Sequence, residues 1–118
     1  MIFIAFFCYK CVSEGTLLYI DDSKTILSGC SSDFNGEVVI PRSVVSISNE
    51  MYDDTIFKNC ANTINALRFE EGSQINYIQS KSFRQTSLIT VNFSECKNLL
   101  QLNSSIFDFH FQKKVIYI

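Results

Sequence analysis

Cysteines have the most chemistry to offer in this 118-residue chain, and their spacing favours a structural role. Cys8 and Cys11 have the C-x-x-C spacing of zinc and redox motifs, but they lie in an apolar run and no second pair follows. The others are Cys30, Cys60 and Cys96, so the total of five is odd and indicates no complete disulfide framework. We expect Cys60 and Cys96 to pack as small hydrophobic residues, with a disulfide to Cys30 or to another chain as the alternative.

Acid–base chemistry has few candidates in this sequence. His110 is the only histidine, and it lies between phenylalanines in the segment FDFHFQ. Adjacent carboxylates occur at residues 21–22, 53–54 and 70–71, in turn-like stretches where acidic residues are common for solvation and local hydrogen bonds. We therefore predict a protein that is not an enzyme, with no cofactor and no metal site.

Composition indicates one folded domain whose partners are not nucleic acids. Hydrophobic residues make up 47% of the chain and charged residues 19%, which is typical of a packed fold. The ten basic and twelve acidic side chains are well mixed, and they sum to a net charge of −2. No basic stripe is therefore available to neutralise a phosphate backbone.

The N-terminal stretch differs in composition from the rest of the chain. Residues 2–9 (IFIAFFCY) are continuously apolar, and a lysine and the short segment CVS follow them. This pattern fits a short secretory signal peptide over residues 1–13, a buried first strand, or a truncated membrane anchor. Elsewhere no apolar run approaches the about 20 residues that a membrane-spanning helix needs, so no such helix is expected.

An internal repeat organises the C-terminal half. Five apolar positions recur with one constant spacing in the sequence, equal to the separation between residue 67 and residue 91. The first set comprises Leu67, Phe69, Ile75, Ile78 and Phe83, and the second comprises Val91, Phe93, Leu99, Leu102 and Phe107. A further step of the same size reaches Val115 and Tyr117, so the sequence suggests a fragment that stops inside its next repeat.

Each copy predicts a short strand followed by a return segment. An apolar-x-apolar triplet opens each copy and has the period of a strand with one buried face. A looser first copy begins at Val38 and Ile40 and contains a polar loop over residues 48–55. The two aliphatic residues and the Phe that follow each triplet are expected to lead the chain back across the core. Stacked copies would then pair their strands into one parallel sheet.

A hairpin is predicted ahead of the repeats. Two strand-like runs, at residues 16–20 and 25–27, flank the polar turn DDSK. A hairpin at this position would cover the N-terminal edge of the sheet. We therefore divide the chain into a possible signal peptide at 1–13, a hairpin cap at 14–37, and about three repeats, the last incomplete, at 38–118.

The segment VVIPRSVVSI, followed by IFKNC, resembles the BspA-like leucine-rich repeats of bacterial and parasitic-protist surface proteins. In that family a strand ends in Ile-Pro, a Ser-Val and a spaced Ile follow, and Ala-Phe-x-x-Cys closes the repeat. The matching residues are Ile40-Pro41, Ser43-Val44, Ile47, Phe57 and Cys60. The later copies depart from the pattern, since only the first keeps the Pro and the closing Cys, and Ile56, Ser82 and Ile106 replace the usual Ala. The resemblance covers residues 15–118.

Taken together, repeat and resemblance predict a β-rich α/β fold: a leucine-rich-repeat solenoid with a short parallel sheet and an N-terminal β-hairpin cap. The middle residue of each triplet would point away from the core, which places Val39, Arg68, Asn92 and Ile116 in one exposed row. Such a row is a candidate binding surface, and the alternative is a merely solvated sheet face.

The resemblance implies a non-catalytic binding or adhesion module of a secreted or cell-surface protein, with proteins or cell-surface ligands as partners. The alternative is a cytoplasmic repeat scaffold for protein–protein interaction. If the chain is secreted, the N-x-[ST] sequons at Asn92 and Asn103 become glycosylation sites. The predicted C-terminal strand, at residues 114–118, would leave an open sheet edge that could self-associate.

Overall fold

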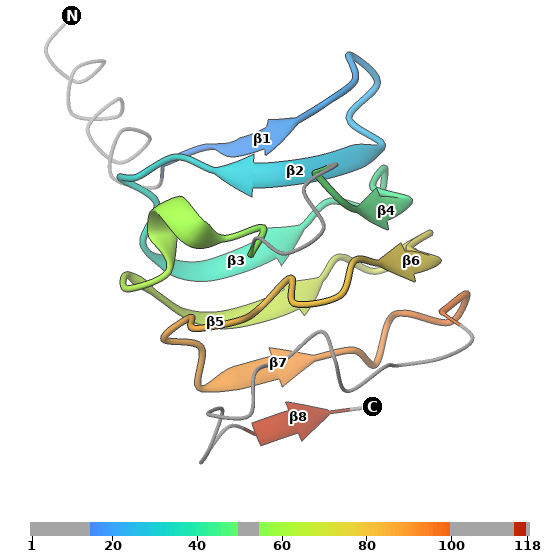
Figure 1. The fold of residues 1–118 in the computed structure, drawn as a ribbon. Helices are drawn as coiled ribbons and strands as arrows, with labels where there is room; N and C mark the ends of the chain where they lie inside the picture. The colour runs from blue at the N-terminus through green and yellow to red at the C-terminus, as the bar shows by residue number, and fades with distance from the viewer. Residues whose placement is uncertain (1–14, 50–54, 100–114, 118) are drawn as a thin grey trace, which may run out of the picture.

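A computed structural model describes residues 15–49, 55–99 and 115–117 of the chain (Figure 1). These residues form eight short strands and one three-residue 3-10 helix, η1, at Lys58–Cys60. The strands are β1 (Leu17–Tyr19), β2 (Ile26–Cys30), β3 (Gly36–Ile40), β4 (Ser46–Ile47), β5 (Ile64–Phe69), β6 (Tyr77–Ile78), β7 (Thr90–Asn92) and β8 (Val115–Tyr117).

The strands belong to two separate sheets. One sheet is mixed, with the order β1-β2-β4-β6, and the other is parallel, with the order β3-β5-β7-β8. From β2 to β7 the chain alternates between the sheets, so that consecutive strands never pair with each other. Figure 1 shows the two sheets side by side, with β4 and β6 displaced from β3, β5 and β7.

The predicted leucine-rich-repeat solenoid with one short parallel sheet is therefore wrong. The described residues form a small α/β-type fold with a mixed and a parallel sheet and almost no helix. The difference comes from the second aliphatic residue of each copy, which was expected to return the chain across the core. Ile47 instead pairs in parallel with Leu27 on one side and with Ile78 on the other, and this pairing creates the second sheet.

The parallel sheet follows the predicted register in part. Leu67 lies opposite Val38 and Val91, so the predicted displacement holds between β5 and β7. Between β7 and β8 the displacement is longer by a single position, because Val91 lies opposite Ile116 where the repeat predicts Val115. Because side chains alternate between the two faces of a strand, a shift of one residue exchanges the residues on the two faces of β8 relative to the predicted register. Ile116 therefore does not continue the predicted row.

The hairpin belongs to the mixed sheet, and so it does not extend the parallel sheet as its cap. β1 and β2 pair antiparallel, and β2 then pairs with β4. Asp21 organises the turn: its Oδ1 accepts from the backbone N–H groups of Thr25 and Ile26, both at 3.0 Å. Its Oδ2 accepts from the Thr25 hydroxyl, and this bond is the largest cause that lowers the pKa of Asp21.

We expect the Asp21 turn to make folding sensitive to acid. The pKa of Asp21 is lower in the folded chain than in the unfolded chain. Its carboxylate therefore contributes fully to stability when the pH is above the unfolded pKa of about 3.9. This contribution is lost as the pH falls through the folded pKa. Thermal unfolding of Asp21→Asn should therefore depend less on pH between about 7 and 3 than that of the parent. Asp22→Asn is the matched control, and an equal loss of pH dependence in both variants would contradict the role of Asp21.

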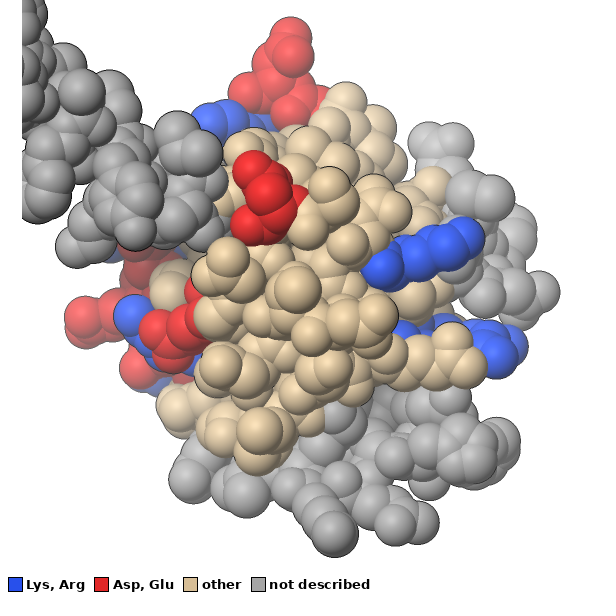
Figure 2. Space-filling view, turned by 90° about the vertical axis from the view of Figure 1, so that its left-hand side faces the viewer, with Lys and Arg blue, Asp and Glu red and all other residues tan. Residues whose placement is uncertain are grey.

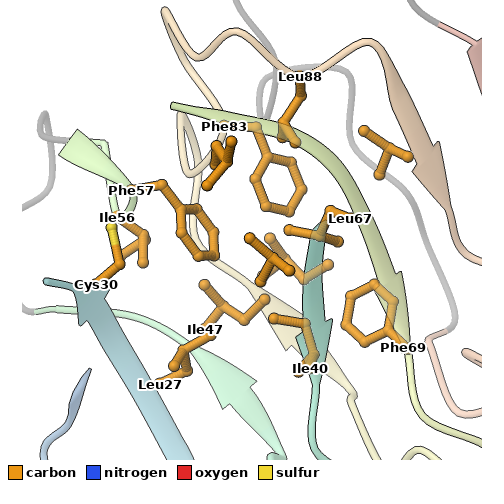
Figure 3. Packing of buried hydrophobic residues seen from close by; sticks show 14 of the residues in the cluster. Leu27, Cys30, Ile40, Ile47, Ile56, Phe57, Leu67, Phe69, Phe83 and Leu88 are labelled. Carbon is orange, nitrogen blue, oxygen red and sulfur yellow. The ribbon is translucent and has the colours of Figure 1, made fainter. Parts of the chain in front are cut away.

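Both sheets bury their inner faces in a single core (Figure 3). Leu27 and Ile47 come from the mixed sheet, and Ile40 and Leu67 come from the parallel sheet; each is at most 1% exposed. Phenylalanines fill the space between the sheets. The ring centroids of Phe57 and Phe83 are 5.6 Å apart, those of Phe83 and Phe93 are 6.4 Å apart, and those of Phe69 and Phe93 are 5.7 Å apart. Phe107, the predicted counterpart of Phe83, lies outside the described residues.

A disulfide joins Cys30, at the end of β2, to Cys60 in η1. The expectation that Cys60 packs as an unpaired hydrophobic residue is therefore wrong, and the alternative pairing with Cys30 is the one present. Cys96 is free and buried, as expected. Burial raises the pKa of its thiol to about 12, with the Glu95 carboxylate adding to the effect, so the group stays protonated at neutral pH.

Gly15 is required where the chain enters β1. Its φ is +73°, and a Cβ atom at this position would lie 2.4 Å from the Cα of Phe34. We expect Gly15→Ala to lower the free energy of unfolding by about 2–3 kcal/mol through backbone strain and overpacking. Gly36 is the matched control, because its φ is +85° but its Cβ would meet nothing within 4 Å. Urea unfolding should give a smaller loss for Gly36→Ala, and equal losses would show that the approach to Phe34 is not the cause.

Candidate binding surface on the parallel sheet

The strands of the parallel sheet alternate between buried and exposed residues. Val38, Ile40, Leu67, Phe69 and Val91 point into the core and are at most 2% exposed. The intervening residues face outward and are half-buried or exposed. We call this side the outer face, and its residues are Glu37, Val39, Ala66, Arg68, Thr90 and Asn92.

Three of the four residues predicted to form the exposed row lie directly opposite one another. Val39 lies opposite Arg68, and Arg68 lies opposite Asn92. The fourth position of this row on β8 is occupied by Tyr117, because Asn92 lies opposite Tyr117. The side chains of β8 lie outside the described part of the structure. Ile116 is therefore assigned no place on the outer face.

Arg68 forms an exposed ion pair on the outer face. Its Nε lies 3.2 Å from Oε2 of Glu37 on the neighbouring strand, and the two side chains are 49% and 48% exposed. An exposed pair of this kind contributes at most about 1 kcal/mol to stability, so its main effect is to orient the guanidinium. The other guanidinium N–H groups are left to donate to a ligand.

A second ion pair lies at the end of the same sheet. Arg42 donates from its backbone N–H to Oε1 of Glu70 at 2.8 Å, and its Nε lies 3.3 Å from the same oxygen. These two contacts lower the pKa of Glu70, the backbone hydrogen bond being the larger cause. Figure 2 shows acidic and basic side chains mainly at the margin of that view and uncharged residues over its centre.

Asn92 is held by a turn immediately after β7. Its Oδ1 accepts from the backbone N–H of Ser94 at 2.8 Å, which leaves Nδ2 as a donor for a ligand. Asn92 also begins a sequon whose middle residue, Phe93, is 4% exposed. Glycosylation at Asn92 stays a prediction, and the second sequon, at Asn103, lies outside the described residues.

A groove borders the outer face where the two sheets meet. Its volume is about 600 Å³. It is lined by residues of the hairpin, of β3 and of the segments that precede β1 and β3: Gly15, Thr16, Leu17, Tyr19, Lys24, Phe34, Asn35, Glu37 and Val39. Glu37 and Val39 belong to both the groove and the outer face. We call this feature the edge groove.

The edge groove was not predicted from the sequence. The signal for Glu37 was present, because it lies two residues before Val39 and so shares its face in a strand. Tyr19 and Lys24 gave no such signal, since they line the groove only because the hairpin folds beside β3. The Lys24 ammonium lies 5.8 Å from the centroid of the Tyr19 ring, within the range of a cation–π contact.

Neither a metal-binding cluster nor a membrane-spanning helix is found in residues 15–49, 55–99 and 115–117. Within these ranges no three His, Cys, Asp or Glu side chains are grouped so that they could hold a metal ion. No helix there is long and apolar enough to cross a bilayer. Cys8, Cys11 and His110 lie outside the described residues.

Comparisons with known proteins give no match: no protein-family model, no curated protein and no solved structure is similar to this chain. The resemblance to BspA-like repeats therefore stays a prediction. The features of the described residues that bear on function are the outer face, the edge groove and the disulfide.

Proposed function

We propose that the chain is a non-catalytic protein-binding module of a secreted or cell-surface protein, and that the outer face makes the contact. The observation that carries this proposal is the in-register row of Val39, Arg68 and Asn92 across three paired strands. This row combines apolar area, a planar cation with several donors, and an amide. Arginine is among the residues enriched at the centres of protein interfaces.

The rigidity of the row supports the proposal. Each of the three residues lies in a strand that pairs with its neighbour in the parallel sheet, and the core behind the row is closely packed. The Arg68 side chain is oriented further by Glu37. A preorganised surface loses less conformational entropy when a partner binds than a flexible loop would.

The disulfide supports the secreted or cell-surface location. Disulfides persist in oxidising compartments and are rare in the cytosol, where thiols are kept reduced. The Cys30–Cys60 bond therefore favours this location over the alternative of a cytoplasmic scaffold. The possible signal peptide at residues 1–13 is consistent with the same location.

The proposal is tested by screening the purified, oxidised chain against an array of extracellular proteins. We expect at least one partner whose affinity falls about tenfold in Arg68→Ala, because a central arginine of an interface contributes this much. Lys97→Ala is the matched control, since Lys97 is an exposed cation in the turn after β7 and not on the outer face. Partners that respond equally to Arg68→Ala and Lys97→Ala would indicate non-specific charge attraction and would contradict a site on the outer face.

A further inference from the structure

The edge groove is lined by the edge strands of the two sheets. β1 is the edge strand of the mixed sheet and β3 is the edge strand of the parallel sheet, as far as the described residues go. Figure 1 shows each of them at the upper edge of its own sheet. The groove is lined from both strands, by Leu17 and Tyr19 of β1 and by Glu37 and Val39 of β3.

Glu37 and Val39 of β3 line the groove, and their backbone N–H and C=O groups point away from the paired strand β5. The N–H of Gly36 donates to Thr63 at 2.9 Å, and the carbonyl of Ile40 accepts from Glu70 at 2.9 Å, so both residues face β5. In a parallel strand the N–H and C=O groups of one residue point to the same side, and successive residues alternate. The peptide groups of Glu37 and Val39 therefore point to the free side, where the groove lies.

The same alternation applies to β1. The carbonyl of Thr16 accepts from Ser31 at 2.8 Å, and the N–H of Ile20 donates to Ile26 at 3.0 Å, so both residues face β2. The irregularity between β1 and β2 adds a residue to β2 and leaves the alternation of β1 intact. Leu17 and Tyr19 consequently turn their N–H and C=O groups away from β2.

The free edge of β3 thus offers the groove donors and acceptors at the spacing of an extended main chain. Alternate residues of a strand repeat about every 6.6–6.8 Å, and an extended peptide presents its own donors and acceptors at the same interval. Free edges of this kind bind peptides by strand addition. The groove volume of about 600 Å³ lies within the usual range of ligand sites.

The lining side chains indicate what the bound segment should contain. Leu17, Phe34 and Val39 offer apolar contacts to alternate side chains of a peptide. Lys24 contacts the Tyr19 ring, and no ion pair joins it to a described carboxylate. Glu37 already pairs with Arg68. The unmatched charge is therefore positive, and its complement is a carboxylate.

We propose that the edge groove binds an extended segment of a partner protein, which adds as a strand to the free edge of β3, presents apolar side chains to the groove and places a carboxylate against Lys24. This proposal rests on the protein-binding function proposed above and specifies a binding mode for it. It requires the N–H of Val39, whereas the outer face requires the Arg68 guanidinium, so the two can fail separately.

The test begins by panning a phage-displayed library of linear peptides against the full-length oxidised chain. We expect the selected peptides to alternate apolar and polar residues and to carry Asp or Glu. A synthetic peptide should lose about tenfold in affinity for Val39→Pro, which removes one edge N–H, and clearly less for Val39→Ala, which keeps this N–H and removes only part of the apolar side-chain contact. Lys24→Gln should weaken binding by up to about fivefold, and Lys97→Gln should not weaken it.

A second measurement keeps the proposal testable if Val39→Pro does not fold. N-methylation of the peptide at alternate residues should abolish binding in one register and leave it intact in the other, because only one set of N–H groups faces β3. Equal effects of Val39→Pro and Val39→Ala in folded variants, or equal effects of both N-methylation registers, would overturn strand addition. So would slow amide exchange of Glu37 and Val39 in the free chain, because the edge would then be filled by the chain's own residues. A failure to select any peptide, alongside Arg68-dependent binding of an array protein, would overturn this inference and leave the proposed function standing.

Discussion

Phe83→Ala should lower the free energy of unfolding by about 3–5 kcal/mol, the range measured when a large buried aromatic side chain is truncated. Phe83 is 1% exposed, and its ring lies between those of Phe57 and Phe93. Truncation would leave a cavity bordered by both rings, and the short strands around it offer little that could move to fill it. Domains of this size have a total stability of about 5–15 kcal/mol, so this loss is a large fraction of the total and should shift the unfolding midpoint clearly.

Urea unfolding followed by circular dichroism measures this effect. Tyr77→Ala is a suitable control, because Tyr77 is an aromatic residue of β6 that is 53% exposed, and we expect a change of about 0.5 kcal/mol or less. If Phe83→Ala and Tyr77→Ala had similar midpoints, Phe83 would not occupy the core. A Phe83→Leu variant should fall between them, since leucine refills part of the volume.

Loss of the Cys30–Cys60 disulfide should cost about 3–4 kcal/mol, because the bond closes a long loop in the unfolded chain. The two cysteines are 30 residues apart, and the loop between them contains β3 and β4. The double variant Cys30→Ala/Cys60→Ala should therefore unfold at a clearly lower urea concentration than the oxidised parent. Reduction of the parent should give nearly the same shift.

Cys96→Ala controls for the removal of a buried cysteine without a cross-link. Reduction should destabilise Cys96→Ala by the same amount as it destabilises the parent, because this variant keeps the Cys30–Cys60 bond. Thiol titration of the unfolded, non-reduced chain gives an independent check. Reactive thiols at both Cys30 and Cys60 in protein from an oxidising compartment would contradict the bond and remove the support that it gives to secretion.

The strands of the parallel sheet could be predicted from the sequence, because each has a period-two pattern and no competing signal. Val38, Leu67 and Val91 were assigned to the buried face, and the structure places them there. The second sheet could not be predicted in the same way. Two aliphatic residues three apart, such as Ile75 and Ile78, are equally compatible with a return segment and with a two-residue strand, and only pairing with Ile47 decides between them.

Register and cross-linking were also beyond the sequence pattern. The constant spacing of the repeat agrees with the pairing of β5 with β7 and with the apolar residues near the C-terminus. The pairing of β7 with β8 nevertheless differs from this spacing by one residue. Cysteine pairing depends on which loops meet in space, and the sequence left Cys30 and Cys60 without a preferred partner. The edge groove was unpredictable for a related reason, since it forms between strands that belong to different sheets.

The self-association predicted for the C-terminal strand stays a prediction. β8 is the last strand in the order of the parallel sheet within the described residues. An unpaired edge of this kind can pair with another chain. The structure describes the backbone of β8 and not its side chains, so the proposed binding sites are confined to the outer face and the edge groove.

The chain alternates between two sheets, and the pairing within the parallel sheet brings Val39, Arg68 and Asn92 into one row. Interstrand nuclear Overhauser effects of the isotope-labelled protein test this arrangement most directly. We expect backbone contacts from Arg68 to Val39 and to Asn92 in one sheet, and from Ile47 to Leu27 and to Ile78 in the other. Contacts in the first group without any in the second would contradict the two-sheet arrangement, and the absence of both would remove the row on which the proposed function depends.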